Sequence, residues 1–234
     1  SASSQGVIDG VSEAVQLAGA DVEVLKARPK PVVKWSKEVV EVETDVVIVG
    51  SGAAGISAAL RADQLGLKTI LLEKMSFVGG AISISGGNQV VSGSKLQHAA
   101  GVSDDTPELM VADFLANGSG LNVKELVTLL AENVGETTDW VHEYMGVDYD
   151  MEQGLHVLAE YQKNRELAYH HGGHGFAASA RKALDNSQVA VYLQTKADRL
   201  LTDGQGKVIG IKAIEESGKT HLIYAKAVVL TTGG

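Results

Sequence analysis

The glycine-rich turn at residues 50–55 is the feature of this sequence most clearly suited to chemistry. It reads Gly-Ser-Gly-Ala-Ala-Gly, the pattern G-x-G-x-x-G. Glycines at these places permit a tight turn, close approach of the backbone to a pyrophosphate, and close packing of a helix on a strand. The first N–H groups of a following helix can then bind phosphate oxygens. The pattern predicts a dinucleotide site, with an incidental glycine turn as the alternative.

A strand and a helix flank this turn, as dinucleotide binding requires. Residues 45–49 are a continuous apolar, β-branched run, which predicts a buried parallel strand. Residues 56–65 are rich in alanine and predict a helix that ends at Gly66. A second strand is predicted over 68–73, and Glu73 ends it. An acid at that place, about 20 residues after the turn, accepts hydrogen bonds from ribose hydroxyls. This context favours the dinucleotide interpretation.

The composition excludes several other classes of protein. The 234 residues are 44% hydrophobic and 21% charged, which excludes disorder of the whole chain. Twenty Lys and Arg stand against 29 Asp and Glu, so no nucleic-acid partner is expected. Without cysteine the chain has no disulfide, thiolate metal site or cysteine nucleophile. No apolar run reaches about 18 residues, so we expect a soluble protein without a transmembrane segment, either cytoplasmic or exported.

The remaining elements follow from the hydrophobic periodicity. Residues 74–103 are rich in Gly and Ser without a strong period, and a long stretch of this kind is usually functional. Helices are predicted from Thr106, over 122–145 and over 172–186. Short strands are predicted over 190–194, 199–202, 208–215, 221–224 and 227–231, with hairpin turns at 203–206 and 217–219.

The N-terminal region is predicted to be separate. Residues 1–25 are expected to form one small amphipathic helix with Ser4 as N-cap. Two prolines and two cations follow at 28–31 and predict an extended linker. The predicted domains are therefore 1–31 and 32–234.

Two further pairs of glycines, at 79–80 and 86–87, indicate which dinucleotide binds. They follow Glu73 and Lys74, beyond the second strand. A nicotinamide dehydrogenase has no need of them, whereas the extended cofactor of a flavin enzyme runs past this strand close to the backbone. The glycine pairs therefore favour a flavin over a nicotinamide.

Several motifs in order along the chain resemble one family of flavoproteins. They are the segments 49–52 and 72–74, the two glycine pairs, Asp139-Trp140 with Gly146-Val147 after it, the run at 172–175, and the closing run at 227–234. From Thr44 to Gly234 the chain resembles the flavoproteins of fumarate reductase and succinate dehydrogenase. The similar branch includes soluble flavocytochrome fumarate reductases, urocanate reductases and ketosteroid dehydrogenases.

The resemblance implies an α/β fold and a role for individual residues. The fold would be a doubly wound, Rossmann-like FAD-binding sheet with an antiparallel β-meander crossover near 197–225. The residues expected to contact FAD are Gly50, Gly52, Ala53, Ala54 and Gly55 at the pyrophosphate, Glu73 and Lys74 at the adenosine ribose, Ala197 at adenine, Gly80, Ala81, Ser85, Gly86 and Gly87 on the flavin side, and Thr231, Thr232 and Gly233 where the chain returns to the cofactor.

The resemblance also implies an activity. A parent flavin oxidoreductase would reduce an activated C=C bond of a fumarate-like carboxylate or an enone, by hydride transfer from FAD N5. The family's substrate-binding histidines, its arginines and its capping domain follow the Thr-Gly-Gly strand, so we expect them outside this chain and name no catalytic residue. No motif identifies an electron donor. The alternatives are a non-catalytic FAD-binding or electron-relay module and a ketosteroid-dehydrogenase-like flavoenzyme.

His170, His171 and His174 precede and follow Gly172-Gly173. Relatives often carry His-Arg-Pro before this glycine pair, whereas this chain has Ala168-Tyr169-His170. Three histidines in five residues suggest a metal, but no carboxylate pattern supports one, so no metal site is predicted. The alternatives are a role facing the cleft near the flavin and ordinary surface histidines.

The first 20 residues resemble the end of an FMN-binding domain. In that domain a run of small and hydroxyl residues carries covalently linked FMN, and a helix ending in Ala-Gly-Ala follows. The match here is Ser1–Ser4 with Ala18–Ala20, and it implies FMN attached to Ser3. A serine cluster that caps a helix is the alternative.

Overall fold

The computed structural model describes residues 2–29, 35–156 and 159–233, and it divides into two compact units. The first unit runs to Trp35 and the second begins at Ser36. The domain boundary predicted at residue 31 lies outside the described residues. Within the described part, no helix is long and apolar enough to cross a membrane.

The first unit, over its described residues, contains two helices rather than the single helix predicted. Helix α1 is Ala2–Leu17 and α2 is Val22–Lys26. Gly19, at φ +79°, lies between them, and the carboxylate of Asp21 accepts hydrogen bonds from the N–H groups of Glu23 and Val24, which begins a new helix. Ser4 lies inside α1, so the prediction that it is the N-cap was wrong.

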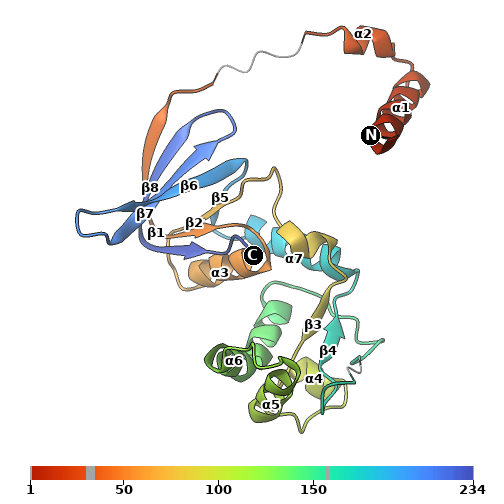
Figure 1. The fold of residues 1–234 in the computed structure, drawn as a ribbon, viewed down its shortest axis with the longest axis vertical. Coiled ribbons are helices and arrows are strands. Elements are labelled where there is room, and N and C mark those ends of the chain that lie inside the picture. The colour runs from red at the N-terminus through yellow and green to blue at the C-terminus, as the bar shows by residue number, and fades with distance from the viewer. Residues whose placement is uncertain (1, 30–34, 157–158, 234) are drawn as a thin grey trace. The chain divides into compact units, whose positions relative to one another are not determined.

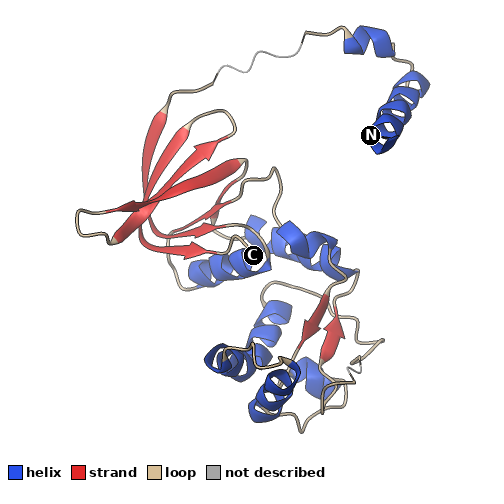
Figure 2. Cartoon of the chain, in the orientation of Figure 1, coloured by secondary structure: helices blue, strands red, loops and turns tan. Residues whose placement is uncertain are grey.

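A six-stranded sheet forms the centre of the second unit (Figures 1 and 2). Its strands are β1 Val39–Val49, β2 Thr69–Leu72, β5 Ala190–Tyr192, β6 Thr195–Thr202, β7 Val208–Glu215 and β8 Thr220–Leu230. The order is β5-β2-β1-β8-β7-β6. The first four of these are parallel, while β6, β7 and β8 form an antiparallel meander. The predicted α/β fold with a meander crossover is confirmed.

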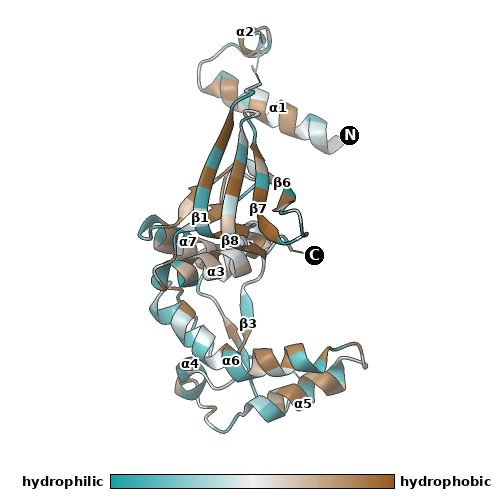
Figure 3. Cartoon of the chain, turned by 90° about the vertical axis from the view of Figure 1, so that its left-hand side faces the viewer, coloured by the Kyte–Doolittle hydropathy of each residue, from teal (hydrophilic) through white to brown (hydrophobic). Residues whose placement is uncertain are grey.

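The two faces of the sheet are covered differently. Helices α3 (Ala53–Gln64) and α7 (Gly172–Asp185) pack on one face, where Ile48 and Leu71 of the strands join Ile56 of α3 in the main core. On the other face, Val47 and Ile70 pack against residues of the meander, which curls over the sheet. Figure 3 shows hydrophobic and hydrophilic residues along β1, β7 and β8, as expected for strands with one buried side.

A helical lobe, residues 88–169, is inserted between β2 and α7. It contains β3 Asn88–Val90, α4 Lys95–Ala99, α5 Pro107–Asn117, α6 Lys124–Glu143 and β4 Glu166–Ala168. Strands β3 and β4 form an antiparallel pair that connects the lobe to the rest of the unit. Strand β4 was not predicted, because its three residues carry too little hydrophobic pattern. The stretch 74–103 is also more ordered than its composition indicates, since it contains the short 3-10 helix η1 (Gly80–Ile84) as well as β3 and α4.

Three strand predictions need correction. Strand β6 begins at Thr195, four residues before the predicted start at residue 199, because Thr195–Ala197 pairs with residues 213–215 of β7. The first strand begins at Val39, six residues before the predicted start, because Val39–Thr44 pairs with residues 220–225. The segments 221–224 and 227–231, predicted as two strands, form the single strand β8. Its middle pairs with β1 on both sides of Asp45, whose carboxylate binds Lys226 at 2.6 Å. Pairing with the long strand β1 thus keeps residues 225 and 226 in a strand, although their sequence alone does not predict one.

Candidate functional site

A cavity of about 710 Å³ opens where β1, β2 and β8 end. These are the carboxyl ends of parallel strands, the usual place for ligands in open α/β sheets. The cavity is lined by Val49, Gly50, Ser51, Gly52, Ala53, Leu72, Glu73, Lys74, Met75, Gly80, Ala81, Ile82, Ser85, Thr195, Lys196, Ala197, Thr231, Thr232 and Gly233. Segments far apart in the sequence therefore converge on one site.

The glycine turn presents the N-terminus of α3 to this cavity. The N-cap is Gly52, which has no side chain to bind the first N–H groups, and the first turn holds no acidic residue. These N–H groups and the helix dipole suit an anion. Gly50 has φ +96°, a conformation that favours glycine. A Cβ on Gly55 would collide with the carbonyl oxygen of Gly50, so α3 packs too closely here for any side chain.

Glu73 fastens the turn to the end of β2. The residue is 6% exposed. One carboxylate oxygen accepts hydrogen bonds from the Ser51 N–H (2.9 Å) and Ser51 Oγ (2.5 Å), and the other accepts one from the Met75 N–H (2.8 Å). Burial raises the pKa of Glu73, but the hydrogen bonds from Ser51 and Met75 outweigh it and hold the pKa below its ordinary value. The carboxylate is therefore an anion that orders the loop at the wall of the cavity.

Thr231 fastens the same turn to the end of β8. Its N–H donates to the Val49 carbonyl at 2.9 Å. Its hydroxyl lies 2.8 Å from the Val49 carbonyl oxygen and 2.9 Å from that of Gly50. Thr231 thus holds the last residue of β1 and the first of the turn in fixed positions.

Charge is distributed unevenly along the cavity. Lys74 and Lys196 are exposed side chains at its wall, while the Glu73 carboxylate is buried beneath the turn. Two exposed cations on a cavity that also contains a helix N-terminus favour a ligand that carries phosphates.

Twelve of the predicted residues line this cavity: Gly50, Gly52, Ala53, Glu73, Lys74, Gly80, Ala81, Ser85, Ala197, Thr231, Thr232 and Gly233. Sequence reasoning missed Val49, Ser51, Leu72, Met75, Ile82, Thr195 and Lys196. Each of these lies within three residues of one that was named, so the strand ends and turns flanking the motifs were the available signal.

The other predicted residues lie elsewhere. Ala54 and Gly55 are in the first turn of α3 but do not line the cavity. Gly86 and Gly87 do not line it either, because they pack against a second glycine pair, Gly172-Gly173. A Cβ on Gly87 would collide with the backbone N of Gly173. Ser3 belongs to α1, and its side chain lies outside the described part of the structure.

The three histidines lie at the start of α7 and are exposed. The rings of His170 and His171 contact edge to face at 4.2 Å between centroids. None of the three lines the cavity. Among the described residues, no group of three or more His, Cys, Asp or Glu side chains is placed to hold a metal ion.

The fold and the cavity define a dinucleotide-binding protein of the Rossmann-like class. The family model described as the FAD binding domain matches residues 45–234, and the chain belongs to that family. The expected resemblance to fumarate reductase flavoproteins is confirmed, and the cofactor is FAD.

Three relatives illustrate the family. A urocanate reductase of Eggerthella lenta is 32% identical over 99% of this chain and 38% of its own length. The open conformation of a flavocytochrome c3 fumarate reductase superposes with TM-score 0.75 at 32% identity, covering 82% of this chain and 34% of that one. A 3-ketosteroid-Δ4-(5α)-dehydrogenase of Rhodococcus jostii RHA1 gives TM-score 0.69 at 25% identity, covering 87% and 47%. The chain spans about a third to a half of the length of these relatives.

The residues present fit FAD. A Cβ on Gly52 would meet nothing within 4 Å, so the wall at the start of α3 leaves open space where a pyrophosphate needs close access to the backbone. The acid at the end of β2 and the two lysines lie on the same cavity. The donor set thus matches a dinucleotide with its phosphates at the helix N-terminus.

Proposed function

We propose that this chain is the FAD-binding part of a flavin-dependent reductase that acts on a C=C bond conjugated to a carboxylate. The observation that carries the proposal is the cavity at the sheet edge in a chain matched over 99% of its length by a urocanate reductase. Urocanate and fumarate, for which two relatives are named, share one chemical feature, a C=C bond next to a carboxylate.

Bound FAD would supply the hydride for such a reduction, since redox chemistry belongs to the cofactor. The residues of this chain bind and orient it. The first N–H groups of α3 hold the pyrophosphate, with Lys74 and Lys196 able to balance its charge. Glu73 fixes the turn through Ser51, and its carboxylate at the cavity wall would accept a hydrogen bond from the ribose. We propose no proton donor within the chain.

An anaerobic assay of the protein that carries this chain tests the proposal. A reduced viologen dye is the electron donor, and fumarate, urocanate and acrylate are offered separately. We expect dye oxidation that depends on at least one of them. Bound FAD without turnover of any unsaturated carboxylate would contradict the proposal and favour an electron-relay module.

A ketosteroid is the second candidate substrate class, supported by the 3-ketosteroid dehydrogenase of similar fold. An enone and an unsaturated carboxylate are both activated C=C bonds, but only the carboxylate carries a charge. A 4-ene-3-ketosteroid in the same assay separates the two. Turnover of the steroid alone would replace the carboxylate proposal.

We also propose that Ser3 carries covalently bound FMN, which would pass electrons to FAD. The sequence of residues 1–20 supports this, and the urocanate reductase match extends over nearly the whole chain. Denaturing the protein with acid separates bound from released flavin. We expect flavin fluorescence on the polypeptide of the wild type and none on Ser3→Ala. Fluorescence that persists in Ser3→Ala, or a polypeptide without any, would contradict the assignment.

A further inference from the structure

The wall of the cavity formed by η1 rests on a junction between two glycine pairs. A Cβ on Gly173 would collide with the carbonyl oxygen of Ile82, and Ile82 and Ser85 both line the cavity. On the other side of the junction, Gly87 lies against the backbone of Gly173. The position of this wall therefore depends on how closely four glycines pack, and glycines have no side chains with which to hold one another.

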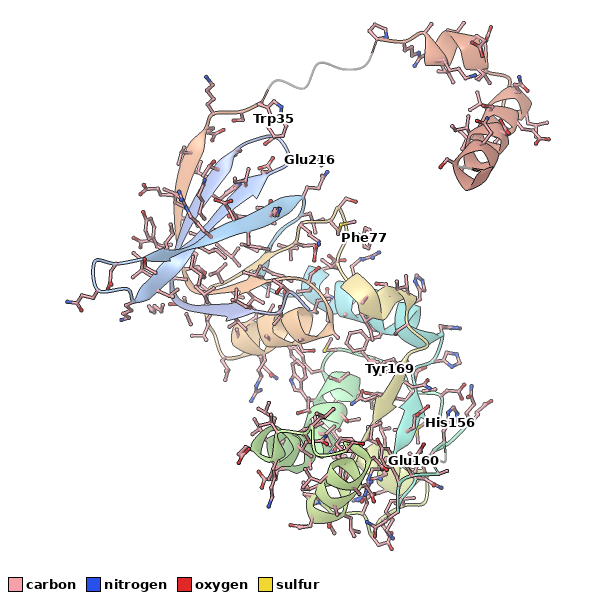
Figure 4. The ribbon with its side chains drawn as sticks, viewed as in Figure 1. Trp35, Phe77, His156, Glu160, Tyr169 and Glu216 are labelled. Carbon is pink, nitrogen blue, oxygen red and sulfur yellow. The ribbon has the colours of Figure 1, made fainter. Side chains whose placement is uncertain are left out.

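A polar side chain next to each glycine pair, half-buried Gln89 and buried Tyr169, connects the two pairs. Gln89 follows Gly87 by two residues, and Tyr169 precedes Gly172 by three. The Tyr169 hydroxyl donates to Gln89 Oε1 at 2.8 Å, and the Tyr169 N–H donates to the Gly87 carbonyl at 2.7 Å. Figure 4 shows Tyr169 between α7 and the β3–β4 pair. Tyr169 thus binds strand β3 through Gln89 and also binds Gly87, which lies just before that strand.

The rest of the lobe holds Gln89 in place. Gln89 Nε2 donates to Thr138 Oγ1 at 2.7 Å, and the Thr138 hydroxyl donates to the Val134 carbonyl at 2.6 Å. The hydroxyl of Tyr149 is a second donor to Gln89 Oε1, at 2.7 Å. Burial raises the pKa of Tyr169 to about 12 and also raises the pKa of Tyr149, so both hydroxyls remain protonated donors. The amide of Gln89 is anchored to α6 and accepts from two phenols.

We propose that Gln89 and Tyr169 form a latch across the glycine junction that sets the position of the η1 wall against bound FAD. The Tyr169 hydroxyl is then a positioning group for the flavin, acting through Gly87, Gly173 and Ser85. This rests on the proposed function, because it takes Gly80, Ala81 and Ser85 to lie on the flavin side of the bound FAD, as the family resemblance implies.

Two matched variants test the latch. Tyr149→Phe and Tyr169→Phe each remove one buried phenol donor from the same acceptor, and each leaves the other donor in place, so neither orphans the Gln89 amide. Tyr149 is 3% exposed and Tyr169 8%. Both substitutions leave the backbone bonds intact. Because the Tyr169 N–H donates to Gly87, only the Tyr169 hydroxyl joins Gln89 to the glycine junction through a single residue. The FAD dissociation constant and the visible flavin spectrum are measured for both without substrate, and urea unfolding gives their stability.

We expect the two variants to lower the unfolding midpoint equally, while Tyr169→Phe alone weakens FAD binding, by about threefold to tenfold, and alters the flavin spectrum. Equal FAD affinities in the two variants, or a larger loss in Tyr149→Phe, would overturn the latch. Because no substrate is present, this result does not depend on which C=C bond is reduced. A wild type that binds no FAD would overturn both the latch and the proposed function.

Discussion

The cofactor edge, where β1, β2 and β8 meet α3, and the helical lobe are held together by different kinds of interaction. At the cofactor edge most contacts are made by the backbone and by small residues, as Gly50, Gly55 and Thr231 illustrate. The lobe depends on buried polar side chains. Arg165 is fully buried there and binds Asp105 through two nitrogens and Asp113 through a third.

The difference follows from what each region has to do. A wall that binds a pyrophosphate must leave backbone N–H groups accessible, so the residues that form it have small side chains or none. The two strands of the lobe are three residues long each, so they offer few backbone bonds across segments. Charged and amide side chains such as Arg165 and Gln97 connect those segments instead.

Removal of the Arg165 cation is expected to have the largest effect. Arg165→Met leaves the carboxylates of Asp105 and Asp113 buried without their counter-ion, which costs about 3–5 kcal/mol of unfolding free energy. Urea unfolding measures the loss. Lys163→Met is the control, because its ion pair with Asp104 lies at the surface and should contribute nothing measurable. Equal stability of the two variants would show that the buried cluster does not hold the lobe.

Two glycines of the same turn should separate folding from binding. Gly55→Ala forces a Cβ onto the Gly50 carbonyl and is expected to cost about 1–3 kcal/mol of stability as well as FAD binding. Gly52→Ala has open space and an ordinary φ of −71°, so the fold should remain intact while FAD binds more weakly. Thermal unfolding and FAD titration distinguish them. Wild-type FAD affinity in Gly52→Ala would remove this turn from the site.

Glu73 is a charged side chain that orders the cofactor edge, and the effect of replacing it should be smaller and should depend on pH. Because its pKa in the folded protein is lowered, its stabilisation is present above the ordinary value of 4.5 and is lost as the pH falls through the lowered pKa. Glu73→Gln turns an amide NH₂ toward the Met75 N–H or the Ser51 donors, at a cost of about 1–2 kcal/mol.

Stability of Glu73→Gln and wild type is compared by urea unfolding between neutral and acidic pH. We expect the difference in unfolding free energy between wild type and Glu73→Gln to be largest at neutral pH and to disappear in acid. A stability difference that stays constant with pH would mean that the charge of Glu73 does not order the turn.

The same contrast explains what could be predicted from the sequence. The turn at 50–55, the end of the strand before it and the helix after it depend on local pattern, and the structure has them close to their predicted positions. The single strand β8 was divided wrongly, because its continuity depends on pairing with β1. Side-chain partners far apart in the sequence carry no local pattern that could predict them. Asp105 and Arg165 are 60 residues apart, and Gln89 and Tyr169 are 80 residues apart.

The flavin of the purified protein that carries this chain tests the central claim most directly. The visible spectrum is recorded, the protein is denatured, and the released flavin is identified by chromatography. We predict a flavin spectrum and release of FAD. A colourless protein that takes up no added FAD would contradict the assignment of the cavity at the ends of β1, β2 and β8 as an FAD site.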